Sequence, residues 1–255
     1  MQTAAMRVAG IDATYELCDV AEAGLPRIAA AVREGALAGC NVTIPHKAAM
    51  ARLCDTLEGD ARTLAVVNTL VGREGTLAGH DTDAAGFERA LREAGLWPEA
   101  GCRAVVFGAG GAAAAVALAL TRVPASSITV VARSEQRAQQ LASHLPAGSE
   151  VRVAAWSSAT AAPHLERADI VVNATPAPAM ALPLDIHALR KSCTVADVRY
   201  RPRPVDLVTA ATARGLAACD GSAMLLHQGM LAFELWTGMA APVEAAREAL
   251  EAALR

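Results

Sequence analysis

The sequence predicts an α/β protein in which a Rossmann-type, doubly wound parallel sheet is inserted into a second α/β domain. From Arg103 onward, short apolar runs typical of strands alternate with alanine-rich helical runs, as in parallel sheets covered on both faces. A glycine-rich turn at residues 108–111 joins the first of these strands to a helix. The flanking segments have helix and strand patterns of their own. We therefore expect one discontinuous domain of residues 1–83 and 221–255 around an inserted domain of residues 84–220.

The composition limits the class of protein. A chain of 255 residues is long enough for two domains, and a net charge of -3 gives no electrostatic basis for binding nucleic acid or an anionic membrane. The six cysteines and six histidines show no metal-ligand spacing, so we expect reduced thiols, a cytoplasmic location and no metal. No basic segment followed by an apolar run opens the chain, which argues against a secretion signal. The uncharged run at residues 104–121 is interrupted by the glycine turn, so we expect no membrane helix there.

The first domain is expected to contain an early amphipathic helix, because Leu25, Ile28 and Val32 fall on one helical face. Pro45 has no N–H and a fixed φ, so it ends a strand and places Lys47 just after a turn. The elements expected in this domain are helices at residues 23–34, 47–53, 223–237 and 242–254, and strands at 40–44, 66–70 and 75–78, the last two flanking a turn at 71–74.

The inserted domain is expected to follow a bridging helix at residues 84–95. This helix is amphipathic and ends at Gly95, a residue type that commonly ends helices. The strands expected after it lie at residues 103–107, 128–132, 151–155, 169–173 and 193–197, with helices between most of them.

The glycine turn predicts a dinucleotide site. Gly108 permits the tight turn after the strand, and Gly110 allows backbone to approach a pyrophosphate. Ala113 occupies the small position where helix meets strand, and the N-terminus of that helix offers free N–H groups to an anion. The alternative is a plain tight turn between a strand and a helix.

The end of the next strand favours NADP over NAD. An NAD site normally has a carboxylate there to bind the ribose 2′-hydroxyl, but this chain has Arg133, with Arg137 one helical turn later. Two guanidinium groups suit a 2′-phosphate. Alternatively, both arginines are simply a solvated helix start.

Several ordered motifs resemble those of the shikimate dehydrogenase family, over nearly the whole chain. The NVTxPxK segment of the family is represented by Asn41 to Lys47, and its later asparagine by Asn68. The family's G-x-N-T-D motif corresponds to Gly79 to Asp83, with Asp81 where asparagine is usual. The remaining similar segments are the glycine loop GAGGAA at 108–113, and residues 132–134, 173–176, 197–202 and 221–228.

This resemblance implies NADP-linked interconversion of shikimate and 3-dehydroshikimate, with a small-molecule substrate, no nucleic-acid or membrane partner, and a monomer or homodimer. Lys47 and Asp83 are similar to the family's catalytic pair. The residues that the resemblance implies for substrate contact are Thr43, Lys47, Asn68, Asp83, Tyr200 and Gln228. Those implied for the cofactor are Gly108, Ala109, Gly110, Gly111, Ala112, Arg133, Ser134, Arg137, Asn173, Thr175, Gly221 and Met224.

The chemistry of these residue types fits that reaction. Hydride arriving at a ketone leaves a developing alkoxide, which needs a cationic or donating group. Lys47 can supply the charge, and Asp83 would hold the ammonium in place. Asp83 favours the protonated lysine, so a lowered Lys47 pKa would have to come from desolvation. It stays open at this point whether Lys47 also transfers the proton. The alternative is a surface ion pair worth at most ~1 kcal/mol.

The N-terminus departs from the family pattern. Members normally begin with a strand and a Ser-x-Ser turn that binds the substrate carboxylate, whereas residues 1–20 resemble the following helix and the strand after it. Three explanations stay open: a start upstream of Met1, a divergent enzyme that binds the carboxylate by another group, or a non-catalytic relative that binds NADP. Quinate or another polyhydroxy cyclic acid is a further candidate substrate.

Overall fold

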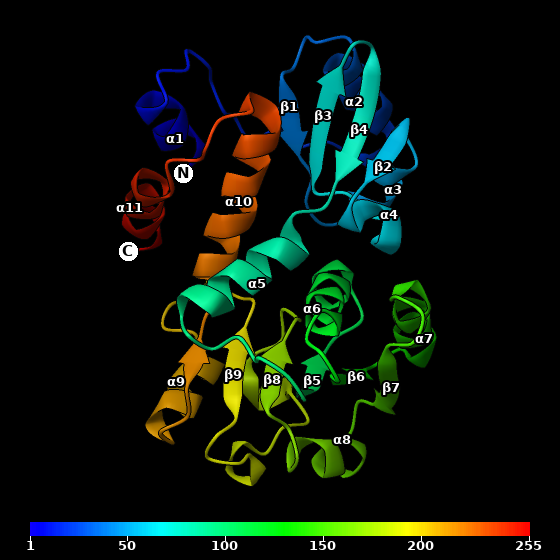
Figure 1. The fold of residues 1–255 in the computed structure, drawn as a ribbon, viewed down its shortest axis with the longest axis vertical. Helices are drawn as coiled ribbons and strands as arrows, with labels where there is room; N and C mark the ends of the chain where they lie inside the picture. The colour runs from blue at the N-terminus through cyan, green and yellow to red at the C-terminus, as the bar shows by residue number, and fades with distance from the viewer. The chain divides into compact units, whose positions relative to one another are not determined.

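The computed structural model describes residues 1–255 as two compact units (Figure 1). One unit comprises Met1–Gly86 and Leu225–Arg255, and the other comprises Phe87–Met224. The divisions fall inside two helices, α5 (Asp83–Glu93) and α10 (Ser222–Thr237), a few residues beyond the boundaries at 83/84 and 220/221 that the sequence suggests. The predicted α/β class, with a discontinuous unit around a Rossmann-type unit, is confirmed.

The discontinuous unit is built on a four-stranded mixed sheet with the order β1-β3-β4-β2. Strand β3 is antiparallel to both β1 and β4, whereas β2 runs parallel to β4. Its strands are β1 (Gly39–Asn41), β2 (Thr56–Glu58), β3 (Thr69–Arg73) and β4 (Thr76–His80). Its other elements, besides parts of α5 and α10, are α1 (Gln2–Val8), the 3-10 turn η1 (Glu22–Gly24), α2 (Leu25–Arg33), α3 (Lys47–Ala51), α4 (Asp60–Leu64) and α11 (Val243–Leu254).

The central hairpin lies later in the chain than predicted. The four-residue turn expected at 71–74 is a two-residue turn at Glu74-Gly75, because both residues adopt positive φ, 50° and 76°. Such a turn matches the twist of the two strands it joins. The strand expected at 40–44 also stops early, at Asn41, because the chain turns soon afterwards, where the His46 N–H donates to the Thr43 carbonyl at 2.9 Å.

The strand expected after the first helix is absent, which corrects that prediction. Residues 11–21 have no regular secondary structure, and β1 forms the edge of the sheet. No strand pairs with the outer edge of β1, so this segment takes no part in the backbone hydrogen bonds of the sheet. Side chains fasten the segment instead: the Tyr15 hydroxyl donates to Asn41 Oδ1 at 2.8 Å, and its ring lies 6.2 Å from that of Trp236.

The C-terminal part of the chain is joined to this sheet by specific contacts. The indole N–H of Trp236, on α10, donates to the carbonyl of Leu70 on β3 at 2.9 Å. A Cβ at Gly39 would lie 2.1 Å from that indole nitrogen, so only glycine fits at this place on β1. Helix α1 is fixed to the same helix, since Gln2 Nε2 donates to the carbonyl of Gly229 at 2.7 Å. Residues from both ends of the chain therefore complete one unit.

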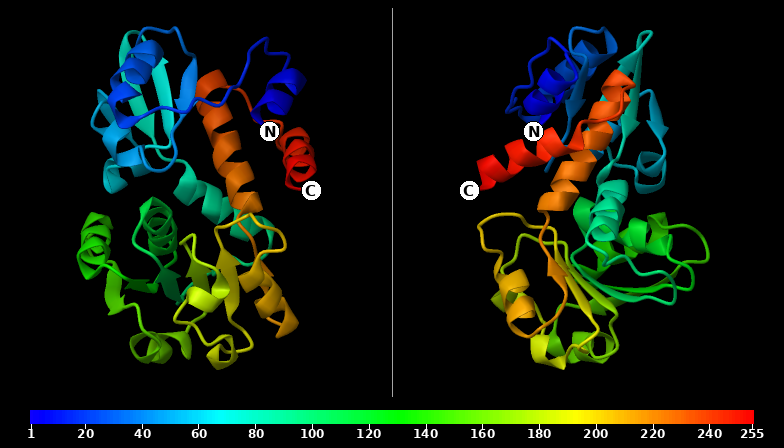
Figure 2. Two further views of the ribbon diagram at one scale, coloured as in Figure 1. Left: turned by 180° about the vertical axis from the view of Figure 1, so that it is seen from behind. Right: turned by 60° about the vertical axis from the view of Figure 1, so that its left-hand side comes forward.

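The second unit contains a six-stranded sheet in which every pair is parallel. Its order, β10-β9-β8-β5-β6-β7, is the 3-2-1-4-5-6 order of doubly wound dinucleotide folds. All five predicted strands are found within one residue of their expected bounds, and Figure 2 shows helices on both faces of the sheet. The strands are β5 (Arg103–Phe107), β6 (Ser127–Ala132), β7 (Glu150–Ala155), β8 (Ile170–Asn173), β9 (Thr194–Asp197) and β10 (Ala218–Cys219). The helices are α6 (Gly111–Thr121), α7 (Glu135–His144), α8 (Ser158–Leu165), α9 (Asp206–Ala213) and the 3-10 turns η2 (Ala179–Ala181) and η3 (Ile186–Ala188).

Helix α6 follows β5 in the uncharged run at residues 104–121. It is apolar on all sides and buried against β5 and β6, which explains the absence of charge. Across the whole chain, no helix combines the length and apolar character needed to cross a bilayer.

Candidate active site

Lys47 lies at the first position of α3, directly after the turn that contains Pro45. Its side chain is only 16% exposed, and its Nζ forms an ion pair with Asp83 Oδ2. A second carboxylate oxygen, Asp81 Oδ2, lies 4.0 Å from the same nitrogen. The predicted contact between Lys47 and Asp83 is therefore present, and Asp81 joins it.

Both carboxylates are positioned by the junction between β4 and α5. The backbone N–H of Asp83, the first residue of α5, donates to Asp81 Oδ1 at 3.0 Å, so the side chain of Asp81 stabilises the start of the helix. The Asp81 side chain is 1% exposed and that of Asp83 is 11% exposed. Two carboxylates and one ammonium thus share a largely dehydrated space.

Asn68, just before β3, connects this group to the rest of the unit. Its Nδ2 donates to Asp83 Oδ1 at 2.7 Å and to Thr82 Oγ1 at 2.9 Å. Its Oδ1 accepts from the Thr82 backbone N–H at 3.0 Å and from the Thr69 hydroxyl at 2.8 Å. Because Asn68 is 2% exposed and fully hydrogen-bonded, it fixes the orientation of Asp83.

Gln228 reaches the same network from α10. Asn68 Nδ2 lies 3.4 Å from Gln228 Oε1, and the Thr82 hydroxyl donates to the Gln228 carbonyl at 2.9 Å. A Cβ at Gly86 would lie 2.8 Å from both the Cβ and the backbone nitrogen of Gln228, so a glycine on α5 permits this close approach. Four of the residues predicted for catalysis and substrate therefore lie together in one unit: Lys47, Asn68, Asp83 and Gln228.

The charges around Lys47 decide its protonation state. Burial alone lowers the pKa of Lys47, but the charges of Asp83 and Asp81 outweigh burial, so the pKa is raised above its usual value. The lowered pKa that desolvation could have produced is not found. Burial, reinforced by the nearby charge of Asp83, raises the pKa of Asp81 to about 7. Lys47 is thus a permanent cation near neutral pH, beside a carboxyl group that titrates there.

Two predicted substrate residues are not brought into this cluster. Thr43 is exposed, in the turn before Lys47, where its carbonyl accepts from the His46 N–H at 2.9 Å. Tyr200 follows β9 in the other unit and is half-buried. Their contact with substrate stays a prediction, as does the expectation that the Lys47–Asp83 couple faces the nicotinamide ring.

The glycine loop of the second unit has the shape that a pyrophosphate requires. Gly108 has φ of +112°, and a Cβ there would lie 2.8 Å from Thr175 Cγ2 and 3.0 Å from the Ala174 carbonyl oxygen. Gly110 is the N-cap of α6, and a Cβ at this residue would meet nothing within 4 Å. The loop therefore packs against the end of β8 through Gly108 and leaves open space at Gly110 for an anion at the helix N-terminus.

The end of β6 presents the predicted arginines. The Arg133 guanidinium carbon lies 5.0 Å from the ring centroid of Trp156, which directly follows β7 and packs edge-on against Phe107. The Ser134 hydroxyl accepts from the backbone N–H of Arg137 at 3.3 Å and so caps α7. Arg133 and Arg137 are both exposed, and the indole ring of Trp156 supports the Arg133 guanidinium by a cation–π contact.

Asn173, at the end of β8, is fully buried, and its amide bonds to the protein itself. Its Nδ2 donates to Asp197 Oδ2 at 3.0 Å and to the Ala177 carbonyl at 3.1 Å, while its Oδ1 accepts from Thr175. Asn173 therefore shapes the loop that lies against Gly108, and we expect it to act on the cofactor through that loop.

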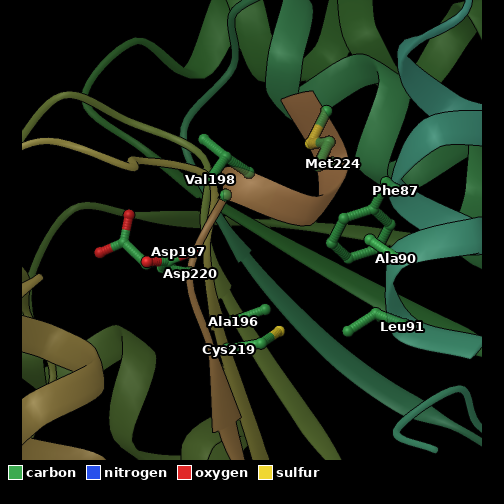
Figure 3. Close-up of a pocket in the computed structure, with 10 residues that line it drawn as sticks. Phe87, Ala90, Leu91, Ala196, Asp197, Val198, Cys219, Asp220 and Met224 are labelled. Carbon is green, nitrogen blue, oxygen red and sulfur yellow. The ribbon is translucent and has the colours of Figure 1, made fainter. Parts of the chain in front are cut away.

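Two further predicted cofactor residues, Gly221 and Met224, line a small pocket (Figure 3). Gly221 is required for close packing, because a Cβ there would lie 1.9 Å from the carbonyl oxygen of Val198. Met224 points into the pocket opposite apolar side chains of α5. Neither Lys47 nor Asp83 lines this pocket, which is a packing gap between α5 and the sheet.

Comparison with known families agrees with this geometry. Residues 1–70 match the shikimate dehydrogenase substrate binding domain, residues 91–208 match shikimate / quinate 5-dehydrogenase, and residues 221–251 match the shikimate 5'-dehydrogenase C-terminal domain. The chain belongs to the shikimate dehydrogenase family.

Individual relatives cover nearly the whole chain. A shikimate dehydrogenase (NADP(+)) from Symbiobacterium thermophilum is 41% identical over 264 aligned residues, which cover 100% of this chain and 89% of the relative. The crystal structure of the shikimate 5-dehydrogenase of Thermus thermophilus, in complex with NADP(H) and shikimate, is 33% identical, with a TM-score of 0.86, and the match covers 99% and 93% of the two chains. The ligand-free 5-ketofructose reductase of a Gluconobacter species is also 33% identical, with a TM-score of 0.85 and coverage of 98% and 91%.

Sequence reasoning assigned no role to three residues that the structure places at these sites. Thr82 links Asn68 to Gln228, and its position inside the Gly79–Asp83 motif was a usable signal. Asp81 was noticed as a departure from asparagine, but its importance depends on burial beside Lys47. Trp156 gave no signal, because its contact with Arg133 depends on the neighbouring positions of β6 and β7.

Proposed function

We propose that this protein is an NADP-dependent oxidoreductase that interconverts 3-dehydroshikimate and shikimate, a step of aromatic amino acid and chorismate biosynthesis. The observation that carries the proposal is the buried Lys47–Asp83 ion pair, held by Asn68, in a chain of the shikimate dehydrogenase family. The intact pair also argues against a relative that only binds NADP, because a protein without catalytic activity has no need of that pair.

The residues fit the cofactor. Gly108, Gly110 and the N-terminus of α6 suit a pyrophosphate, and Arg133 with Arg137 suit a 2′-phosphate. Bound NADPH supplies a hydride for reduction of the ketone, and bound NADP+ accepts one for oxidation of the alcohol.

The protein's own groups handle the charge on the substrate oxygen. The Lys47 ammonium can donate a hydrogen bond to the carbonyl oxygen, which becomes negative as the ketone is reduced. Asp83 holds that ammonium through one oxygen, while Asn68 binds its other oxygen. This arrangement fixes the cation before substrate arrives, so little reorganisation is needed during the reaction.

The test is turnover by the purified protein, followed through the absorbance of reduced nicotinamide. Shikimate with NADP+ and 3-dehydroshikimate with NADPH should both react, and NAD should be the poorer cofactor. Quinate and 5-ketofructose are the comparison substrates. Tight NADP binding without turnover would contradict the proposal and favour a binding protein, whereas a clear preference for quinate would change the substrate but not the reaction class.

We also propose a cytoplasmic enzyme that is a monomer or homodimer and takes a small molecule as substrate. Support for a small-molecule substrate comes from the complex of the Thermus relative with NADP(H) and shikimate. Sedimentation of the purified protein tests the oligomeric state, and cell fractionation tests the location.

A further inference from the structure

The cluster around Lys47 holds one more negative charge than the reaction requires. Asp83 alone balances the ammonium, yet Asp81 Oδ2 also lies 4.0 Å from it, with a side chain that is only 1% exposed. The two carboxylates are tied together, because Asp81 Oδ1 accepts the backbone N–H of Asp83. With both ionised, this dehydrated space would carry a net charge of -1.

Other charged groups near Asp81 do not remove that surplus. Lys47 on α3 favours ionised Asp81, but it is already paired with Asp83 at the start of α5. Asp60 on α4 is a third carboxylate whose charge also opposes ionisation of Asp81. His80, the preceding residue on β4, titrates at lower pH, because burial lowers its pKa. Carboxyl groups that share a buried site ionise together only at a high cost in free energy, so one of them keeps its proton to a higher pH than the others.

We propose that Asp81 is the proton-exchanging member of this cluster, and that its ionisation, rather than that of Lys47, sets the pH dependence of the reaction in both directions. This inference rests on the proposed function. Asp81 is the candidate because it is the more buried carboxylate, and because both oxygens of Asp83 are engaged by Lys47 and Asn68. The direction of its pKa, raised to about 7, supports the same assignment.

The protonation state of Asp81 has opposite consequences for the two directions. With Asp81 neutral, Lys47 and Asp83 cancel, and the ammonium can stabilise the negative oxygen formed during ketone reduction. With Asp81 ionised, the surplus negative charge opposes that oxygen but favours loss of the hydroxyl proton during alcohol oxidation. Reduction consumes one proton: the Lys47 ammonium passes it to the substrate oxygen and neutral Asp81 restores it to Lys47, so the step ends with a cationic lysine and an ionised Asp81, and oxidation reverses this transfer. The rate of reduction should therefore follow the neutral form of Asp81 and the rate of oxidation its ionised form. Both pH profiles should change slope at the same pH.

The kinetic test compares wild type with Asp81→Asn. Asparagine has nearly the same shape, keeps an oxygen to accept the Asp83 N–H, and is the usual family residue at this position. In wild type, kcat/KM for 3-dehydroshikimate reduction should be flat below a breakpoint near neutral pH and should fall roughly tenfold per pH unit above it. In Asp81→Asn the breakpoint should move upward, toward the titration of Lys47. An unchanged breakpoint in the variant would overturn the proposal.

A matched control removes the charge of the third carboxylate near Asp81, that of Asp60. Asp60→Asn should move the breakpoint slightly downward, because it removes a charge that opposes ionisation of Asp81. Movement of the breakpoint in the same direction in both variants would show a general charge effect and contradict a specific role for Asp81.

A second measurement needs neither turnover nor a variant enzyme that folds. The carboxyl carbon of Asp81, observed by 13C NMR in ligand-free wild-type protein, should titrate near pH 7. Titration below about pH 5, close to the ordinary aspartate range, would overturn the inference whatever the activity assay shows. Absence of turnover together with a neutral midpoint would instead contradict the proposed function and leave the assignment of the proton to Asp81 intact.

Discussion

Replacement of Lys47 by methionine tests the centre of the proposed site. Methionine keeps an unbranched side chain of similar length, so the packing of the lysine stem is largely retained while the charge is removed. Asp83 and Asn68 stay in place, and the glycine loop lies in the other unit. The variant therefore isolates the contribution of the ammonium.

The expected loss follows from the charge and its burial. An ammonium that is 16% exposed acts in a medium of effective dielectric constant near 20, where a full negative charge at ~3 Å is stabilised by about 5.5 kcal/mol. A half-developed alkoxide would gain about half of that. At 1.36 kcal/mol per decade, the change predicts a fall in kcat of roughly 10²–10⁴.

The assay is steady-state shikimate oxidation at saturating NADP+, with NADP affinity measured separately by calorimetry. The affinity should barely change, because the predicted cofactor residues lie in the Phe87–Met224 unit. Arg62→Met is the matched control: Arg62 forms an exposed ion pair with Glu58 at 3.3 Å, and its side chain is 72% exposed. Exposed ion pairs of this kind contribute little to stability, so kcat of the control should stay close to the wild-type value.

The reasoning is refuted if kcat of Lys47→Met stays within a few-fold of wild type at saturating substrate. In that case Lys47 would be a structural ion pair, and the negative oxygen would have to be stabilised by another group. A fall in kcat that is matched by an equal fall in the Arg62→Met control would likewise point to general destabilisation of the unit.

Three further predictions concern stability and the cofactor. In Lys47→Met, the melting temperature should fall further at pH 8 than at pH 5. A buried acid with a raised pKa, such as Asp81, makes the folded state less stable as pH rises through that pKa. Removal of the Lys47 ammonium raises the pKa of Asp81 further, so the variant loses more stability at the higher pH. Arg133→Ala should weaken NADP binding by roughly tenfold or more while NAD binding changes little, and Trp156→Leu should have the same effect to a smaller extent, both measured by calorimetry with the two cofactors. Gly108→Ala should weaken NADP binding at least about tenfold, since the new Cβ would collide with Thr175 and the residue is at positive φ, whereas the pH titration of Asp81 should stay as in wild type.

The sequence predicted the second unit better than the first, for a physical reason. Strands buried on both faces, such as β5 and β8, appear as continuous apolar runs bounded by breaks, so their limits are visible in one dimension. The β3–β4 hairpin was misplaced because its position depends on which residues adopt positive φ, and Glu74 is not a residue type that signals this. The strand expected within residues 11–20 was wrong because a strand also requires a partner, which the local pattern does not reveal.

The candidate active site likewise contains residues that sequence motifs predict and residues whose role depends on the folded structure. The Lys47–Asp83 pair could be predicted because its motifs resemble those of a known family. Gly108 could be predicted because its turn has a recognisable spacing. The role of Asp81 could not be predicted, because the same residue would be an ordinary helix cap if it were exposed to solvent. The platform that Trp156 forms for Arg133 arises only when β6 and β7 pair.

The geometry of the cluster also indicates which task Lys47 is suited to perform. A lysine ammonium has three N–H donors. Asp83 Oδ2 binds Lys47, while Asn68 engages Asp83 Oδ1 and the Asp83 N–H engages Asp81 Oδ1. Asp81 Oδ2 then lies within ion-pair distance of Lys47, so two carboxylates hold the cation and a donor remains for the substrate oxygen. A cation held in this way gives up a proton reluctantly, so Lys47 is cationic before and after the step, and the net gain and loss of a proton near neutral pH fall to Asp81.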